Sequence, residues 1–422
     1  MPEIRCRWNR SSRRFMVKFL LFCCAAISTS SCFGQTASAS QLQTLYDSHQ
    51  WFAFRDATEQ GKAPLFYRGA MEAAFNQIKL AQKNLSAVIK AAPHSHDAHE
   101  AHEMLAEMYF RNGLYREAYL QIGAILAEDP NADDVKNVSS MFRALSQSDQ
   151  IVLTKKASTL PMFMNEDGVY VPIVLDGHEA HYSLDTGSNL SVMSESEAKR
   201  LGLQVQGVET QFGSVTAAHI GARIAIVKAL IIGGLHLENV AFDVLPDAQE
   251  PFVDSPEEER GILGIPVLIA MQTFRWDPKG TFAFGFKPKH KNLSTSNLAF
   301  DGPMPVTQVA VEHKKLEFTL DTGETHSILY APFAKEFSDL LKASGQKESH
   351  KLTGLAGSSN YDSVLLPSLQ LELGGLDVRL APAHVLTEDI NGNWAPGNLG
   401  MDLLNQARTV TFDFHAMTLS LQ

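Results

Sequence analysis

The triplet Asp-Thr-Gly occurs twice in this chain, as Asp185-Thr186-Gly187-Ser188 and as Asp321-Thr322-Gly323-Glu324. Each copy follows a run that alternates apolar and polar residues. Each Asp is also followed, at the same distance in both copies (261 − 185 = 397 − 321), by a Gly-x-Leu-Gly sequence that begins at Gly261 or Gly397. One triplet alone is a weak signal. Two copies with matched downstream glycines predict a duplicated domain that brings two carboxylates together.

Two carboxylates held within a few ångströms of each other have a defined acid–base chemistry. They cannot both ionise at low cost, so they share a proton, and the pKa of one rises while that of the other falls. The ionised carboxylate can take a proton from water while the protonated one donates to a carbonyl oxygen. Such a pair cleaves an amide without a covalent intermediate. We therefore expect Asp185 and Asp321 to be catalytic, with no metal and no cofactor.

A longer pattern surrounds both triplets. Val192 and Ile328 stand seven residues after the respective Asp, and Leu268 and Leu404 stand four residues after the last Gly of each Gly-x-Leu-Gly. From Ala157 to Gln422 the chain therefore resembles the aspartic peptidases of the pepsin and retroviral-protease superfamily, with retropepsin-like domains as the closer likeness. The resemblance implies an all-β, two-lobed acid-protease fold.

The resemblance also implies a role for each motif residue. Asp185 and Asp321 would form the dyad, and Thr186 and Thr322 would brace it across the lobe interface. Strands at Leu263-Gly264 and Leu399-Gly400 would support the two loops from behind. The other expected supports are Gly187, Gly323 and Ser188, with each glycine supplying a positive φ and the serine hydroxyl reaching Asp185. A glycine-containing hairpin would cover the cleft, at Gly213-Ser214-Val215 or at Gly354–Gly357.

The second triplet departs from the family pattern at Glu324, where Ala, Ser or Thr is usual. A third carboxylate facing the dyad would disturb proton sharing, whereas one pointing to solvent would not. Two functions therefore stay open. The first is an aspartic endopeptidase that binds an extended protein or peptide substrate as an added strand. The alternative is a catalytically inactive peptide-binding adaptor built on a disabled protease fold.

The region 41–150 has a helical pattern, poor in glycine and rich in Ala, Glu, Gln and Leu. Small and apolar residues fall at the spacing of a tetratricopeptide repeat, in one clear copy and one weaker copy. The positions are Leu105, Ala106, Tyr109, Ala118, Ile122, Ile125 and Pro130, then Gly69, Ala81, Leu85, Val88 and Pro93. We expect a tetratricopeptide-like domain that recruits a protein partner; a plain bundle of helical hairpins is the alternative.

The composition is that of a globular protein, and 422 residues are too many for one ordinary hydrophobic core. We therefore expect a multi-domain chain. An all-α region is followed by two all-β lobes, expected at 157–290 and 300–422. The net charge of −11 argues against nucleic acid as a partner. Two lobes in one chain remove the need for a dimer, so we expect a monomer.

The segment 1–34 has the pattern of an export signal. A basic segment precedes the apolar run Phe19–Ile27, and small or polar residues follow. The four cysteines all lie between Cys6 and Cys32, so cleavage after Gly34 leaves a mature chain without cysteine. We expect a periplasmic or secreted protein. A twin-arginine signal at Arg13-Arg14 is an alternative, and membrane attachment is expected only if Cys32 is lipidated.

Four histidines are concentrated in a short segment, at His94, His96, His99 and His102. His99 and His102 are three residues apart and could share a helix face, as metal ligands do. The segment falls at a loop and a helix start, where exposed polar residues are normal. We therefore expect an ordinary surface.

Overall fold

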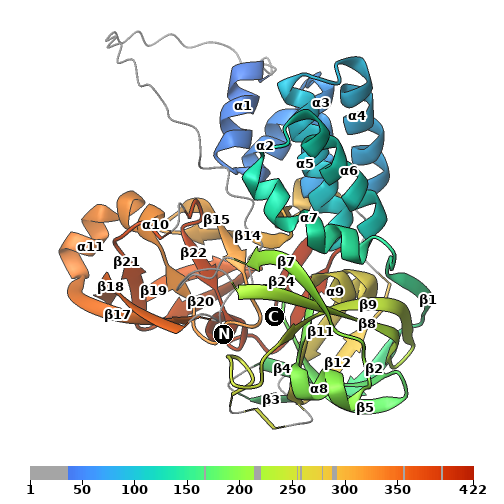
Figure 1. Ribbon diagram of the computed structural model, residues 1–422. Helices are drawn as coiled ribbons and strands as arrows, with labels where there is room; N and C mark the ends of the chain where they lie inside the picture. The colour runs from blue at the N-terminus through green and yellow to red at the C-terminus, as the bar shows by residue number, and fades with distance from the viewer. Residues whose placement is uncertain are drawn as a thin grey trace.

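The computed structural model describes residues 37–165, 168–212, 220–253, 255–256, 259–277, 279–287, 292–354, 357–390 and 393–422 (Figure 1). A helical region is followed by two β-rich lobes, which confirms the predicted fold class. The expected export signal at 1–34, with every cysteine, lies outside the described residues. So does the hairpin candidate Gly213-Ser214-Val215, and so do residues 355–356 of the other candidate.

The helical region consists of antiparallel hairpins stacked side by side. Helices α3 and α4 pack together, as do α4 and α5, α5 and α6, and α6 and α7. Ser38 and Ser95 cap α1 and α5 by accepting backbone N–H groups through their hydroxyls. The helices are α1 (Ala39–Asp47), α2 (Trp51–Glu59), α3 (Leu65–Ala74), α4 (Ile78–Ala91), α5 (His96–Arg111), α6 (Tyr115–Glu128) and α7 (Asp133–Leu145). None of the described helices has the length and apolar character needed to cross a bilayer.

Most of the repeat-like positions pack in the interior of this region, whereas Pro93 and Pro130 are exposed. The residues of that pattern that are buried include Ala81, Leu85, Leu105, Ala106, Tyr109, Ala118, Ile122 and Ile125. Such packing is shared by tetratricopeptide repeats and by other helical hairpin stacks, so the assignment to that repeat family stays a prediction.

Lobe 1 is a closed barrel. Strands β9, β6, β10, β5, β4 and β8 hydrogen-bond in that order, and β8 pairs back with β9. Strand β1 extends the sheet at one edge and begins at Ile151, before the expected start of the lobe. The elements are β1 (Ile151–Lys155), β3 (Phe163–Asn165), β4 (Gly168–Leu175), β5 (His178–Leu184), β6 (Ser191–Ser194), α8 (Glu195–Arg200), β7 (Gln206–Phe212), β8 (Ile220–Ile232), β9 (Leu235–Leu245), β10 (Gly261–Leu263) and α9 (Ile265–Met271).

Lobe 2 repeats this arrangement as an open sheet, in the order β17-β18-β21-β16-β22-β15-β14-β19-β20. Pro367 and Pro382 interrupt the strands that correspond to β8 and β9, because proline has no N–H to donate to a ladder. The elements are β13 (Leu298–Asp301), β14 (Met304–Val311), β15 (Lys314–Leu320), β16 (Ile328–Leu329), α10 (Ala331–Glu336), α11 (Ser338–Ser344), β17 (Gln346–Gly354), β18 (Gly357–Leu366), β19 (Leu369–Leu373), β20 (Leu376–Leu380), β21 (Ala383–Leu386), β22 (Gly397–Leu399) and α12 (Met401–Leu404).

A further sheet joins the two lobes. It runs β2-β12-β11-β23-β24, and its central pair connects β11 of the first lobe with β23 of the second. Phe274 faces Phe412 in this pair, and their rings stack 4.9 Å apart. The strands are β2 (Ser158–Pro161), β11 (Thr273–Asp277), β12 (Thr281–Phe284), β23 (Val410–Asp413) and β24 (Thr418–Leu421). The lobes therefore share backbone hydrogen bonds and a core.

The helices contact both lobes, and Figure 1 shows them at one end of the molecule above the pair. The Glu317 carboxylate accepts hydrogen bonds from the Trp51 and Phe52 N–H groups at the start of α2, at 2.7 and 3.0 Å. Arg111, buried at the end of α5, donates to the Gly302 carbonyl at 2.8 Å. Gln150 donates to the Pro266 carbonyl of lobe 1 at 2.9 Å. The helical region is thus part of one packed body.

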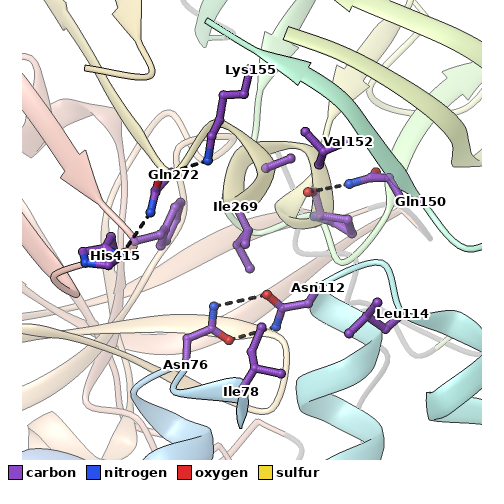
Figure 2. A pocket seen from close by; sticks show the side chains of 13 residues that line it. Asn76, Ile78, Asn112, Leu114, Gln150, Val152, Lys155, Ile269, Gln272 and His415 are labelled. Atoms are coloured by element: carbon purple, nitrogen blue, oxygen red, sulfur yellow. Dashed lines mark hydrogen bonds between the residues drawn. The ribbon is translucent and has the colours of Figure 1, made fainter. Parts of the chain in front are cut away.

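A cavity of about 410 Å³ lies at this seam (Figure 2). Its walls come from the helical region, from β1, from α9 and from the C-terminal segment near His415. Two hydrogen-bonded polar pairs are among the side chains that line it, Asn76 with Asn112 and Lys155 with Gln272. None of the residues expected to act in catalysis lines it.

Candidate active site

Each Asp-Thr-Gly loop is held by a pair of parallel strands. Asp185 follows β5, which pairs in parallel with β10, and Asp321 follows β15, which pairs in parallel with β22. The Asp185 N–H donates to the Leu263 carbonyl at 3.0 Å, and the Asp321 N–H donates to the Leu399 carbonyl at 2.9 Å. The two Leu-Gly strands thus lie directly beside the loops, where the resemblance placed them.

Two serines that were not predicted accept hydrogen bonds from the last glycine of each Gly-x-Leu-Gly sequence, behind the loops. The Gly264 N–H donates to the Ser191 hydroxyl at 3.1 Å, and the Gly400 N–H donates to the Ser327 hydroxyl at 2.9 Å. An added Cβ at either glycine would meet a backbone carbonyl oxygen at 2.2 to 2.4 Å, which excludes larger residues. Ser191 and Ser327 are related by the same offset as Asp185 and Asp321, so the sequence did contain a signal for this pair.

The two threonines form a symmetric lattice across the lobe interface. Each backbone N–H donates to the other threonine's hydroxyl at 3.0 Å, from Thr186 to Thr322 and from Thr322 to Thr186. The Thr186 hydroxyl donates to the Leu320 carbonyl at 2.9 Å, and the Thr322 hydroxyl donates to the Leu184 carbonyl at 2.8 Å. All four bonds are buried and join one lobe to the other. They hold the two loops at a fixed separation.

The carboxyl groups of Asp185 and Asp321 meet inside this lattice. They lie within hydrogen-bonding reach of each other, and the residues are 6% and 1% exposed. Each Asp also accepts the N–H of the glycine two residues later, at 2.7 Å in lobe 1 and 2.9 Å in lobe 2. The structure therefore brings together the two residues expected to form the dyad.

The glycines of the triplets are needed for a reason other than the expected one. Neither Gly187 nor Gly323 has a positive φ, so that expectation was wrong. Instead, a Cβ on Gly187 would lie 2.3 Å from the Asp321 carboxyl oxygen, and one on Gly323 would lie 2.5 Å from the Asp185 carboxyl. Each glycine makes room for the carboxyl of the opposite lobe.

The two carboxyls have different neighbours. In lobe 1 the Ser188 hydroxyl donates to Asp185 Oδ2 at 3.0 Å. In lobe 2 the corresponding residue is Glu324, and Asn398 Nδ2 lies 3.4 Å from Asp321 Oδ2 instead. Asn398 is itself oriented by the Thr319 hydroxyl, which donates to its Oδ1 at 2.7 Å. Asn398 was missed because it is the variable residue of its Gly-x-Leu-Gly, and nothing in the local sequence marks it.

The electrostatics of the site distinguish the carboxyls further. Burial, followed by the charge of Asp321 and a hydrogen bond to it, raises the pKa of Asp185 well above its usual value. The Gly187 N–H and the Ser188 hydroxyl oppose this rise only in part. Burial, with a smaller contribution from Asp321, raises the pKa of Glu324 to about 8. Burial therefore favours the protonated form of both Asp185 and Glu324.

The shifted pKa predicts how stability changes with pH. A carboxyl whose pKa rises on folding stabilises the fold below its usual pKa, and this contribution is lost as pH rises toward the folded-state value. Asp185→Asn cannot ionise, so we expect its melting temperature relative to wild type to increase as the pH rises above about 4, the ordinary pKa of an aspartic acid. Thermal unfolding followed by circular dichroism at several pH values measures this. A difference that stays constant with pH would contradict the assignment of the proton to Asp185.

Comparisons with known proteins give a family match and similar solved structures. Residues 171–267 match the family model described as aspartyl protease. A retropepsin-like aspartic protease from Rickettsia conorii is similar over 31% of this chain and 92% of its own, at 17% identity and a TM-score of 0.22. Basic 7S globulin from soybean is similar over 64% of this chain and 95% of its own, at 12% identity and a TM-score of 0.35. No curated protein sequence matches the chain.

Residues 171–267 are therefore an aspartyl protease domain, which includes Asp185 and ends within α9. The second lobe, outside the matched residues, supplies the corresponding Asp321 loop beside β22.

Proposed function

We propose that this protein is an exported aspartic endopeptidase. One observation carries the proposal: two buried carboxyls, one from each lobe, are in hydrogen-bond contact inside a lattice of four buried inter-lobe hydrogen bonds. Such preorganisation has a chemical use, because it fixes an acid and a base on either side of one water molecule.

The roles follow from the two environments. Asp185, whose pKa is raised, is the acid that donates its proton to the carbonyl oxygen of the scissile amide. Asp321 is the base that takes a proton from the attacking water, so that the hydroxyl adds to the carbonyl carbon. Collapse of the tetrahedral intermediate then breaks the C–N bond. The proton held by Asp321 goes to the leaving amine, and one hydroxyl of the intermediate returns a proton to Asp185 as the C=O bond re-forms. The products are one carboxylic acid and one amine, and the dyad returns to its starting state.

The other functional parts of the proposal concern substrate and location. An extended protein segment would lie between the lobes as an added strand, because main-chain hydrogen bonds and alternate side-chain pockets suit that geometry. The export signal at 1–34 would direct the chain to the periplasm or out of the cell. The helical region, packed on both lobes, would present its free face to a protein partner or to the substrate.

The test is digestion of an unstructured protein by the purified protein, at intervals between about pH 3 and about pH 8, where a carboxyl dyad can hold one proton. New peptide termini are identified by mass spectrometry. The control is the double variant Asp185→Asn with Asp321→Asn. Cleavage by wild type alone supports the proposal. Equal cleavage by both proteins, or none by either while wild type is folded and binds peptide, overturns it in favour of the adaptor.

Glu324 gives a separate prediction. Because its pKa is near 8, it stays neutral through the acidic and neutral range and becomes a second negative charge beside Asp321 only above that. We expect Glu324→Gln to change kcat/KM by less than about threefold at acidic pH, and to retain more activity than wild type above about pH 8. The pH profiles of the two proteins measure this. A rise of tenfold or more at acidic pH in the variant would show instead that Glu324 impairs the dyad throughout.

A further inference from the structure

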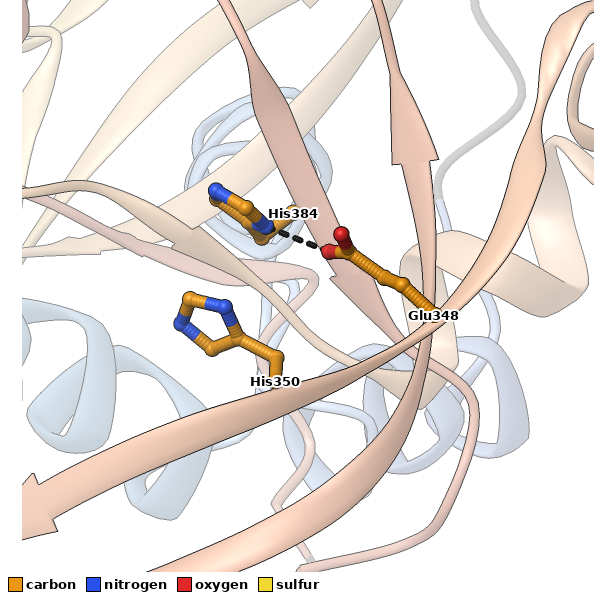
Figure 3. A group of neighbouring side chains, drawn as sticks. All are labelled: Glu348, His350 and His384. Carbon is orange, nitrogen blue, oxygen red and sulfur yellow. Dashed lines mark hydrogen bonds and ion pairs between the residues drawn. The ribbon is translucent and has the colours of Figure 1, made fainter.

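A second group of chemically active side chains lies in lobe 2, outside the dyad. Glu348 and His350 project from β17 and His384 projects from β21, and the three point toward one another (Figure 3). One potential ligand atom from each lies within 4.8 Å of those of the other two. The Glu348 carboxylate is hydrogen-bonded to His384 Nδ1 at 2.6 Å, and the two imidazole rings are 4.1 Å apart.

The sheet explains why three residues from non-adjacent strands meet. Strand β18 lies between β17 and β21, and Ser363 stands opposite Glu348 on one side and Leu386 on the other. Residues opposite each other or two apart on neighbouring strands share one face of a sheet, so Glu348, His350 and His384 are on the same face as Ser363. Since Ser363 is small, Glu348 and His384 can reach each other across it. Its hydroxyl lies 3.4 Å from the Glu348 carboxylate oxygen.

We propose that Glu348, His350 and His384 form a binding site for a divalent transition metal ion, with Zn²⁺ as the best-suited occupant. Two imidazole nitrogens and one carboxylate are a common donor set for Zn²⁺, which leaves a fourth tetrahedral position for water. Zinc–ligand bonds of about 2.0 to 2.1 Å place the ligand atoms of a tetrahedral site about 3.3 Å from one another. The three donor atoms here lie within 4.8 Å of one another, so small side-chain rotations would bring them to that separation. The strands fix the backbone from which these rotations start.

The site has the burial and support expected of a binding site. The Glu348 and His384 side chains are 27% and 28% exposed, which leaves an entry path while limiting competition from bulk water. Ser363, 3% exposed, serves as an outer partner that orients the carboxylate. The histidines of α5 differ: His96 and His99 each pair with a glutamate one turn along the same helix, at 3.8 and 3.5 Å. Within the described residues, the lobe 2 cluster is where three donors converge.

The position of the site suggests what bound metal would do. Strand β17 leads to the β17–β18 hairpin, one of the two hairpins expected to cover the cleft. Strand β21 pairs with β16 at Leu329 and Val385, directly after the Asp321 loop. A metal ion held by β17 and β21 would tie the outer strand of the hairpin to the part of the sheet that carries Asp321. The proposal stands on these contacts and does not require peptidase activity.

The test uses the purified full chain after treatment with a chelator. We expect calorimetry to show one equivalent of Zn²⁺ bound, Zn²⁺ to raise the melting temperature, and Co²⁺ to give the visible spectrum of a four-coordinate ion. Replacing an outer partner of a metal site weakens binding by about 10- to 100-fold, so His350→Gln with His384→Gln, which removes two ligands, should weaken it by at least about 100-fold. Ser363→Ala should weaken it by about tenfold.

The matched control removes the other histidine group, as His96→Gln with His99→Gln. It should bind Zn²⁺ like wild type, and both double variants should melt within a few degrees of the metal-free wild type. Failure of wild type to bind Zn²⁺ or Co²⁺ at one equivalent overturns the proposal. So does binding that survives in the His350/His384 variant, or that disappears in the His96/His99 control. Peptide cleavage is measured separately, so its absence leaves the metal result interpretable.

Discussion

Asp185→Asn and Asp321→Asn should each lower kcat/KM for a peptide substrate by about 10²- to 10⁴-fold, the range by which a positioned acid or base accelerates proton transfer. The reason is that each carboxyl carries one of two proton transfers in the same step, and neither carboxyl can replace the other. Asn at 185 has no acidic proton for the carbonyl oxygen, and Asn at 321 cannot accept a proton from water. Both variants keep the shape of the site, because an amide can occupy the space of a carboxyl between Gly187 and Gly323.

The double variant makes this prediction sharper. When two residues act as a unit, replacing one already abolishes the contribution of the other. Replacing both should therefore lower kcat/KM no further than replacing either one. We expect Asp185→Asn with Asp321→Asn to fall within about threefold of the slower single variant. Steady-state kinetics with a fluorogenic peptide measures the three proteins, and circular dichroism confirms that each is folded. Multiplicative losses would show that the two carboxyls act in separate steps and do not form a dyad.

Thr322→Val should destabilise the protein by about 2 to 6 kcal/mol, because it leaves two buried polar groups without partners at about 1 to 3 kcal/mol each. The groups are the Thr186 N–H, which donates to the Thr322 hydroxyl, and the Leu184 carbonyl, which accepts from it. Valine has nearly the shape of threonine, so the effect isolates the lost hydrogen bonds. The loops would also separate slightly, and kcat should fall with stability.

Thr322→Ser is the matched control. It keeps the hydroxyl and removes one methyl group, which costs about 0.8 kcal/mol if that group is fully buried. Urea unfolding followed by tryptophan fluorescence compares the two variants with wild type. If Thr322→Val and Thr322→Ser shift the urea midpoint of unfolding equally, the inter-lobe hydrogen bonds do not contribute the stability assigned to them. If only valine does, the four inter-lobe bonds are what hold the dyad together.

Much of the active site was accessible from the sequence because its motifs are local and repeated. Asp185 and Asp321 each stand in a short loop next to their own strand, and one constant offset in position relates the two halves. The same offset connects Ser191 with Ser327, whose support of the loops was overlooked. Local pattern and repetition require no knowledge of distant contacts.

Other features depend on contacts between residues far apart in the chain. The glycines of the triplets were assigned a positive φ, but their real constraint is the opposite carboxyl, which only the docking of the two lobes reveals. Asn398 is distant from Asp321 in sequence, and its amide reaches that carboxyl only because β22 pairs with β15. The contacts of the helical region with both lobes likewise have no sequence signature.

The sequence by itself therefore determined the duplicated acid-protease lobes, the identity of the two aspartates and the helical region before them, since each follows from residue type and spacing along the chain. Tertiary structure alone decided which atoms face each carboxyl, how the lobes share a sheet through β11 and β23, and where the helices pack. It also brought His350 within reach of His384 across a strand. The physical reason is that a hydrogen bond or a set of metal ligands requires atoms within a few ångströms of one another. Strand pairing sets those distances between residues that are far apart in the chain and that no repeat in the sequence relates.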